Sequence, residues 1–184
     1  MSEQIGIPVG SGYIYETVFD GSTIPSDATI ETDTNRLGYI EKGATLTYKA
    51  TFKKFKDDMG KVARNVLTEE EVTLKLGLIS WVYSKLDVLC ATCRITEKEG
   101  GRTIKIGGID NADGRKHVFR FVHPDKELGD VRITIVGTNT GGLTLKYAKD
   151  DSTNVEPEIS AEPCDNEGTL VLLDIKDPAA AVKS

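Results

Sequence analysis

The cysteine pair Cys90-Ala-Thr-Cys93 has the spacing of thiols that exchange electrons or bind a metal ion. A redox pair of this kind normally lies at the start of a helix, where the helix dipole stabilises the thiolate. The apolar residues that precede this pair predict a helix ending at it, so the dipole would oppose ionisation. We therefore predict that Cys90 packs in the core and that the pair has no redox role.

A metal site would need ligands beyond this cysteine pair. The candidates are Cys164, His117 and His123. The two histidines fall six residues apart on one predicted strand, or about 20 Å at the rise of a strand, so they cannot share one ion. Phe119 and Phe121 alternate with them, which indicates an aromatic strand face. We predict neither a metal ion nor a cofactor.

The motifs of common enzymes are missing from the sequence. It has no Gly-x-Ser-x-Gly nucleophile elbow and no phosphate-binding Gly-x-x-x-x-Gly-Lys loop. The stretch 110–115 is predicted to be a hairpin turn, because it lacks the alternating ligands of a calcium loop. Acidic residues are scattered over many predicted strands. We predict a protein that is not an enzyme and has no catalytic residues.

Composition narrows the possible partners. The chain has 184 residues, 39% of them hydrophobic, and a net charge of −6. This acidity disfavours generic binding of nucleic acid, which needs a basic surface. No apolar stretch approaches the roughly 20 residues that span a bilayer. We expect a protein made in a cytoplasm, without an export signal and without a membrane.

A long hairpin is predicted over residues 44–79, and it would position several candidate functional residues. Leu46, Tyr48, Ala50 and Phe52 alternate with polar residues, which is typical of a half-buried strand. Residues 70–78 alternate in the same way. The intervening segment is charged and forms the tip of the hairpin. The tip residues that we predict to act in assembly are Lys53, Lys54, Lys56, Asp57, Asp58, Lys61 and Arg64.

One helix is predicted over 80–93, with Ser80 as its N-cap. Apolar residues recur there at helical spacing, which gives one amphipathic stripe. The residues that we expect to pack this helix against a sheet are Trp81, Val82, Leu86, Leu89 and Cys90.

Short strands separated by turns are predicted for most of the remaining chain. They are expected at 13–19, 94–97, 102–106, 117–123, 130–136, 143–148, 155–162 and 170–175. We predict a mainly β protein, a β-sandwich or half-barrel with one flanking helix. Residues 1–30 form an N-terminal arm with one strand, 31–176 form the domain, and 177–184 form a flexible tail.

Charge is distributed unevenly along the chain. Residues 49–64 contain six basic and two acidic residues, and 150–184 contain nine acidic and two basic residues. Two solvated surfaces would explain this pattern. A head-to-tail contact, in which a basic hairpin meets an acidic surface of the next copy, would explain it equally well.

The order of elements carries a family resemblance. An N-terminal strand and a long hairpin are followed by the alternating run 72–78 and a Trp-bearing segment, 80–89. A Gly-Gly hairpin, Phe-Arg-Phe-Val-His-Pro (119–124) and the strand beginning at Val131 come next. Over roughly residues 12–176 the chain resembles the major tail tube proteins of long-tailed bacteriophages.

The resemblance implies a structural subunit of the virion tail, assembled in the cytoplasm of a host bacterium. Such subunits form hexameric rings that stack into a tube through the terminal arms and the long hairpin, whose charged tip residues would make the inter-ring contacts. The tube surrounds a tape measure protein, ends on tail terminator and baseplate proteins, and conducts DNA without binding it specifically. The alternative is a monomeric β-sandwich that binds a ligand.

Overall fold

The computed structural model describes residues 10–81, 83–145, 149 and 155–176. The predicted mainly β architecture is confirmed. Seven strands form the main sheet: Tyr13–Val18 (β1), Arg36–Lys56 (β2), Ala63–Trp81 (β3), His117–His123 (β6), Val131–Asn139 (β7), Glu158–Glu162 (β8) and Leu172–Ile175 (β9).

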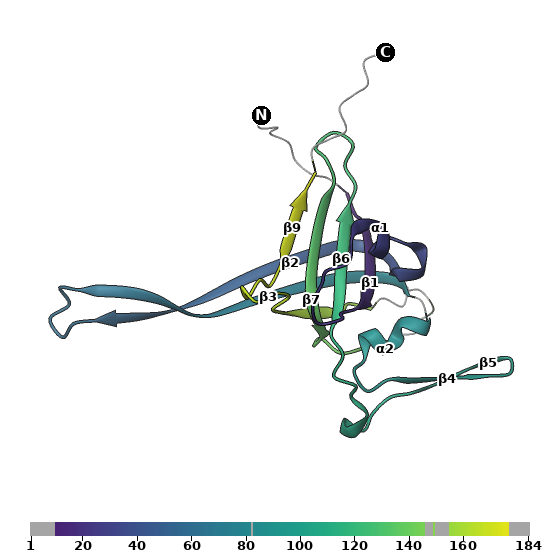
Figure 1. Cartoon of the computed structure of the whole chain (residues 1–184). Helices are drawn as coiled ribbons and strands as arrows, with labels where there is room; N and C mark the ends of the chain where they lie inside the picture. Colours follow the sequence, from purple (N-terminus) through teal and green to yellow (C-terminus); the bar gives the residue numbers. More distant parts are fainter. Residues whose placement is uncertain (1–9, 82, 146–148, 150–154, 177–184) are drawn as a thin grey trace, which may run out of the picture.

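The main sheet closes on itself. Its order is β6-β1-β2-β3-β8-β7-β9, and β6 also pairs with β7. A circuit of six antiparallel strands therefore forms a barrel, and β9 is added to β7 as an edge strand. Figure 1 shows this body with the long β2–β3 pair leaving it on one side. Closure explains how the barrel strands avoid open edges in a single chain.

The barrel interior is apolar because one face of each strand carries branched or aromatic residues at period two. Ile14, Leu74, Phe119 and Ile159 are fully buried there. Phe119 lies opposite Ile135 in the β6–β7 register. All seven residues of β6 are buried, since its other face is covered as well. This core fixes the directions in which the outer parts of β2, β3 and β9 point.

The helix predicted over 80–93 is wrong in its extent. β3 continues to Trp81, and Ser80 pairs with Tyr39 of β2 instead of capping a helix. A 3-10 turn, Tyr83–Lys85, then leads into the short helix Leu86–Leu89 (α2). Pairing with β2 outweighs the helical spacing in this segment. Val82 lies outside the described residues, and Leu86 and Leu89 are buried in the core while Cys90 is half-buried.

The segment predicted as an N-terminal arm is integrated into the barrel. β1 lies between β6 and β2, which makes it an interior strand. The helix Asp27–Ile30 (α1) follows, and the side chain of Ile30 is fully buried against the outer face of the sheet. The 3-10 turn Asp33–Asn35 connects α1 to β2. Residues 1–9 and the predicted tail, 177–184, lie outside the described residues.

The remaining elements lie beside the barrel. Arg94–Lys98 (β4) and Gly101–Lys105 (β5) form a separate hairpin, as predicted from the Gly-Gly turn, and the 3-10 turn Ile109–Asn111 follows. The strand predicted at 143–148 is not found in residues 143–145, and its other residues are not described. Val155 forms only an isolated bridge with Leu78, so β8 is shorter than predicted.

Candidate assembly interface

The outer part of the β2–β3 hairpin projects from the barrel as an arm (Figure 1). We define the arm as residues 47–72. Its strands stay paired as far as Lys56 and Ala63. The turn is held by Asp57, whose carboxylate accepts a hydrogen bond from the Val62 amide at 2.6 Å. Asp57 therefore shapes the tip, although the sequence indicated only its charge.

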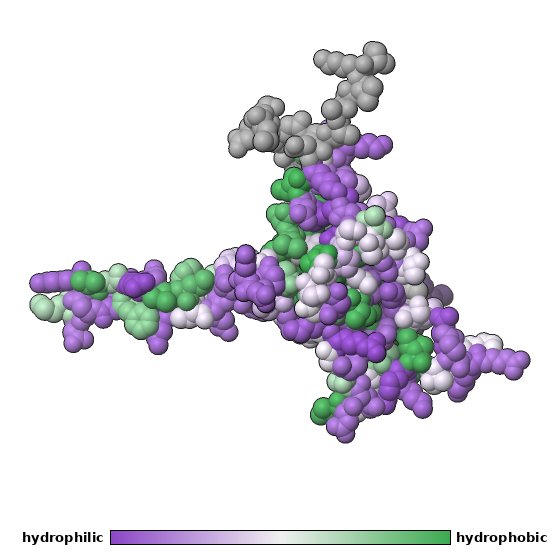
Figure 2. Space-filling view, viewed as in Figure 1, coloured by the Kyte–Doolittle hydropathy of each residue, from purple (hydrophilic) through white to green (hydrophobic). Residues whose placement is uncertain are grey.

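The face of the arm that was predicted to be half-buried is largely exposed. Tyr48 is 58% exposed and Phe52 is 60% exposed, and Leu67 opposite Phe52 is also exposed. At the base, Leu46 packs against the core and Val72, opposite Tyr48, is buried in it. The reason is that the arm extends past the barrel, so its apolar face has no opposite wall. Figure 2 shows hydrophobic colour at several places along the arm.

The predicted tip residues are all exposed. They do not share one face, because adjacent residues of a strand point to opposite sides. Lys54 and Lys56 lie on the apolar face, whereas Lys53 lies on the other with Phe55, whose ring centroid is 5.4 Å from the Lys53 ammonium. Asp58 and Lys61 belong to the turn, and Arg64 pairs in register with Phe55. The arm thus presents positive charge on both faces.

The polar face at the base of the arm is balanced in charge. Nζ of Lys49 lies 3.4 Å from Glu71, and Nζ of Lys75 lies 2.8 Å from Glu158. The hydrogen bond with Glu158 raises the pKa of Lys75. Together with Thr47 and Thr73 these side chains line a concavity of about 220 Å³. This face is suited to water, and its lysines carry little uncompensated charge.

The acidic C-terminal segment is partly neutralised within the same chain. Glu156, Glu158 and Glu162 form ion pairs with lysines of neighbouring strands or loops, at N–O distances between 2.5 and 3.4 Å. Their partners are Lys42, Lys75 and Lys116, in that order. The predicted acidic receptor for a basic hairpin is therefore weaker at β8 than the sequence indicated.

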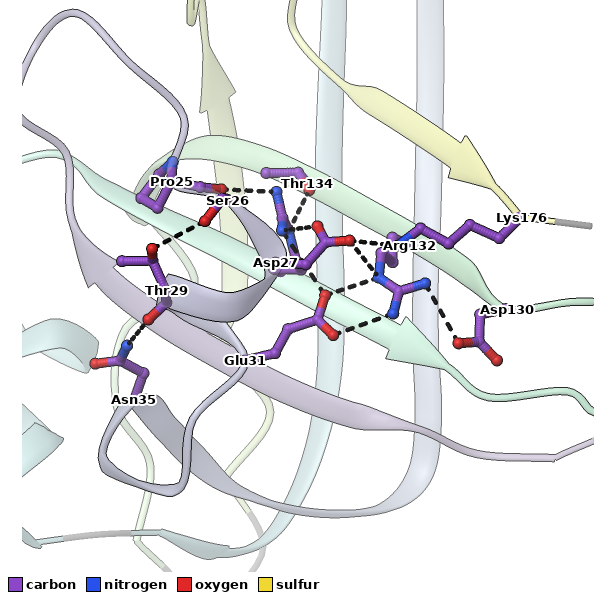
Figure 3. A network of polar contacts seen from close by, with 11 residues as sticks. Pro25, Ser26, Asp27, Thr29, Glu31, Asn35, Asp130, Arg132, Thr134 and Lys176 are labelled. Atoms are coloured by element: carbon purple, nitrogen blue, oxygen red, sulfur yellow. Dashed lines mark hydrogen bonds and ion pairs between the residues drawn. The ribbon is translucent and has the colours of Figure 1, made fainter. Parts of the chain in front are cut away.

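A partly buried cluster of ion pairs attaches α1 to the outer face of the barrel (Figure 3). Arg132 binds both oxygens of Glu31, at 2.7 and 3.1 Å. Arg120 binds Asp27 at 2.7 Å, and Lys176, which directly follows β9, binds the same carboxylate. These contacts lower the pKa of Asp27, chiefly through the hydrogen bond with Lys176. This cluster was not predicted, although basic residues alternate with apolar ones in the sequences of β6 and β7.

A second exposed apolar patch lies on β9. Leu173 is 54% exposed and Ile175 is 67% exposed. In register they oppose Ile133 and Val131 of β7. The sequence predicted this strand. It gave no sign that β9 lies beyond the closed circuit of strands, so that the side chains on its inner face are exposed.

A concavity of about 650 Å³ is formed by loops at one end of the barrel. It is lined by residues 18–22, 114–116 and 163–166. Basic and acidic side chains are mixed there, Arg115 and Lys116 with Asp20 and Asp165. This concavity is the place at which the ligand-binding alternative can be tested.

The cysteine and histidine candidates do not form a common metal site in the described residues. Cys90, Cys93 and Cys164 are free thiols. Burial raises the pKa of Cys93, and Cys90 and Asp87 add to this effect. His117 binds Glu16 and His123 binds the Ser11 carbonyl. Within the described residues, no three His, Cys, Asp or Glu side chains are grouped to hold a metal ion.

The chain shares its fold with a solved structure. One match is to a chain of a structure titled as the anti-feeding prophage cap, the AFP tube terminating cap, with a TM-score of 0.51 and 8% sequence identity. The match covers 96% of this chain and 97% of that one. At such low identity the likeness establishes the fold. No protein-family model and no curated protein sequence matches the chain.

In the described parts of the chain, no helix has the length and apolar character needed to cross a membrane.

Proposed function

We propose that this chain is a non-catalytic structural subunit of a phage tail tube. Copies assemble head-to-tail into hexameric rings, and the rings stack into a tube around a tape measure protein. The tube later conducts DNA and ends on terminator and baseplate proteins. This places the chain in the virion tail after assembly in the bacterial cytoplasm.

The observation that carries the proposal is the arm. An isolated two-stranded ribbon is at best marginally stable in water. This one extends from the barrel with Tyr48, Phe52 and Leu67 exposed on one face. Exposed apolar groups on a projecting element are typical of surfaces that become buried in an assembly. The fold shared with a tube terminating cap supports the same conclusion.

The experiment is electron microscopy and sedimentation velocity of the purified chain over a wide concentration range, with and without tape measure protein. We expect rings with a central opening, and tubes at high concentration. A monomer under every condition would contradict the proposal. Light scattering that shows a monomer, combined with a ligand bound at the loop concavity, would favour the binding-module alternative.

A second candidate role is a cap that ends a tube, because the solved structure sharing the fold is such a cap. In this role the chain would form a ring that does not add further rings of its own kind. The same micrographs separate the two roles, since a tube subunit gives particles of increasing length and a cap gives rings of constant height.

A further inference from the structure

The inner face of the barrel continues beyond the barrel on two separate elements. On β9, Leu173 lies opposite Ile133, which packs against the core, so both point to the inner face. On the arm, Tyr48 lies opposite Val72, which is buried in the core. The exposed side chains of both elements thus lie on extensions of the inner face, which on the arm also carries Glu70, hydrogen-bonded to the Tyr48 hydroxyl at 2.6 Å. Figure 2 shows hydrophobic colour at the position of β9 as well as along the arm.

Both elements also have an open edge. In the described chain β9 pairs with β7 only, and β3 between Ala63 and Val72 pairs with β2 only. An open edge presents backbone groups that can hydrogen-bond to another strand. Strand addition at such an edge, combined with side-chain contacts on one face, is a common mode of recognition.

β9 is short, but it is firmly held. Its last residue is followed by Lys176, whose amide donates a hydrogen bond to the Asp130 carbonyl at 2.9 Å. The Lys176 ammonium binds Asp27 in the ion-pair cluster of Figure 3. An edge strand fixed at its end loses little conformational freedom when a second strand binds. β9 is therefore preorganised as a receptor.

We propose that β9 of one copy receives the arm of a second copy. Tyr48, Phe52 and Leu67 of the arm would cover Leu173 and Ile175. The outer part of the arm, residues 49–64, contains six basic and two acidic residues, and β9 carries the exposed carboxylate of Asp174, which favours this pairing. This inference rests on the proposed function and names the surface that completes it.

The arm that binds to β9 must come from a second copy, because the arm of a chain cannot reach β9 of the same chain. The arm continues the barrel strands β2 and β3 and points away from β9 (Figure 1). The donor surface (the arm) and the receptor surface (β9) are different parts of the same chain, so the contact is heterologous. Every pair of copies therefore has one arm and one β9 that are still free to bind. Such contacts continue until a ring or filament forms.

The test uses two variants, Phe52→Asp in the arm and Leu173→Asp in β9, at a concentration at which the wild-type chain is fully assembled. Each variant alone is expected to remain monomeric by sedimentation velocity. Their equimolar mixture is expected to form a complex of twice the monomer mass and nothing larger. The intact arm of the Leu173→Asp chain would bind the intact β9 of the Phe52→Asp chain.

Ile109→Asp is the matched control, because Ile109 is 91% exposed but lies in the turn after β5. It is expected to assemble like the wild type. Ile175→Asp repeats the β9 test at a second position, and circular dichroism confirms that each variant is folded.

If the wild type and Leu173→Asp both assemble, or if the mixed variants stay monomeric while the wild type assembles, β9 is not the receptor and only this inference fails. A wild-type chain that never assembles would overturn the proposed function and this inference with it.

Discussion

Oε1 of Glu16 on β1 lies 2.6 Å from Nδ1 of His117 on β6, inside the barrel. The second oxygen of Glu16 accepts a hydrogen bond from Lys85 at 2.8 Å, just before α2. One buried carboxylate thus connects two barrel strands to the helix. A buried charge is stable only when it is paired in this way.

The stability of the chain should fall in acid through Glu16. Burial would raise the pKa of Glu16, but the hydrogen bonds with His117 and Lys85 outweigh it, and the pKa is lowered. A carboxyl with a lowered pKa stabilises the fold above its unfolded pKa of about 4.3, and this contribution is lost as pH falls through the folded pKa. Urea unfolding between about pH 2 and 6 should show a shallower pH dependence for Glu16→Gln than for the wild type.

Glu99→Gln, in the exposed turn between β4 and β5, is the control and should keep the wild-type pH dependence. Equal slopes for the wild type and Glu16→Gln would show that this carboxylate does not couple folding to protons.

Charge reversal at the tip should block assembly without unfolding the chain. Lys53, Lys54 and Lys56 are exposed and make no ion pair with other described residues. Changing all three to Glu should lower tube formation at least about tenfold and leave the unfolding free energy within about 0.5 kcal/mol, as expected of exposed sites. Light scattering and urea unfolding measure the two effects.

The matched control is the triple reversal of Lys98, Arg102 and Lys105 on the other projecting hairpin, β4–β5. If both triple variants assemble equally well, the charge of the arm has no specific role.

The ion-pair cluster should contribute to stability through Arg132. Its guanidinium is mostly buried and binds both oxygens of Glu31. Arg132→Met leaves Glu31 without this partner and should cost about 3 kcal/mol of unfolding free energy. The double variant with Glu31→Met should cost less than the sum of the single variants, because contacting residues are coupled.

Arg102→Met removes an exposed ion pair with Glu97 and should cost less than about 1 kcal/mol. Equal losses for Arg132→Met and Arg102→Met would mean that burial of the cluster adds nothing.

Barrel closure should be sensitive to Gly137 of β7. A Cβ at this position would lie 1.9 Å from the Ser160 carbonyl oxygen of β8. Gly137→Ala must therefore push β7 and β8 apart and should cost about 2 kcal/mol or more. Thermal unfolding of both variants measures this cost. Gly101→Ala is the control and should not change stability, because a Cβ there meets nothing within 4 Å.

Local sequence patterns, such as alternating residues and turn residues, were sufficient to predict many of the strands. The strand at His117–His123 was predicted to the residue, because alternating aromatic residues end at a His-Pro turn. The Gly-Gly turn likewise located β4 and β5. The segment 80–93 failed since helical spacing carries no information about Gly38 and Tyr39, which pair with it across the hairpin. Local propensity yields to such long-range pairing.

The candidate interface was less accessible to sequence analysis. Period two showed that Tyr48 and Phe52 share a face, but it could not show where the barrel ends along the strand. The ion-pair cluster joins Glu31 to Arg132, 101 residues apart in the sequence. No local pattern predicts such a pair, because it arises only when α1 folds back over β6 and β7.

The β2–β3 ribbon passes from the barrel wall into the arm without a break in its strand pairing beyond three local bulges. Two lie at its root, between Tyr39 and Ile40 and near Gly43, and one lies midway, opposite Thr51–Phe52. Mechanically the ribbon is a beam fixed at one end in the core. A load at its free end would be carried into the wall as bending, and the bulges are where the ribbon would flex. A filament built from such levers would resist extension while tolerating curvature.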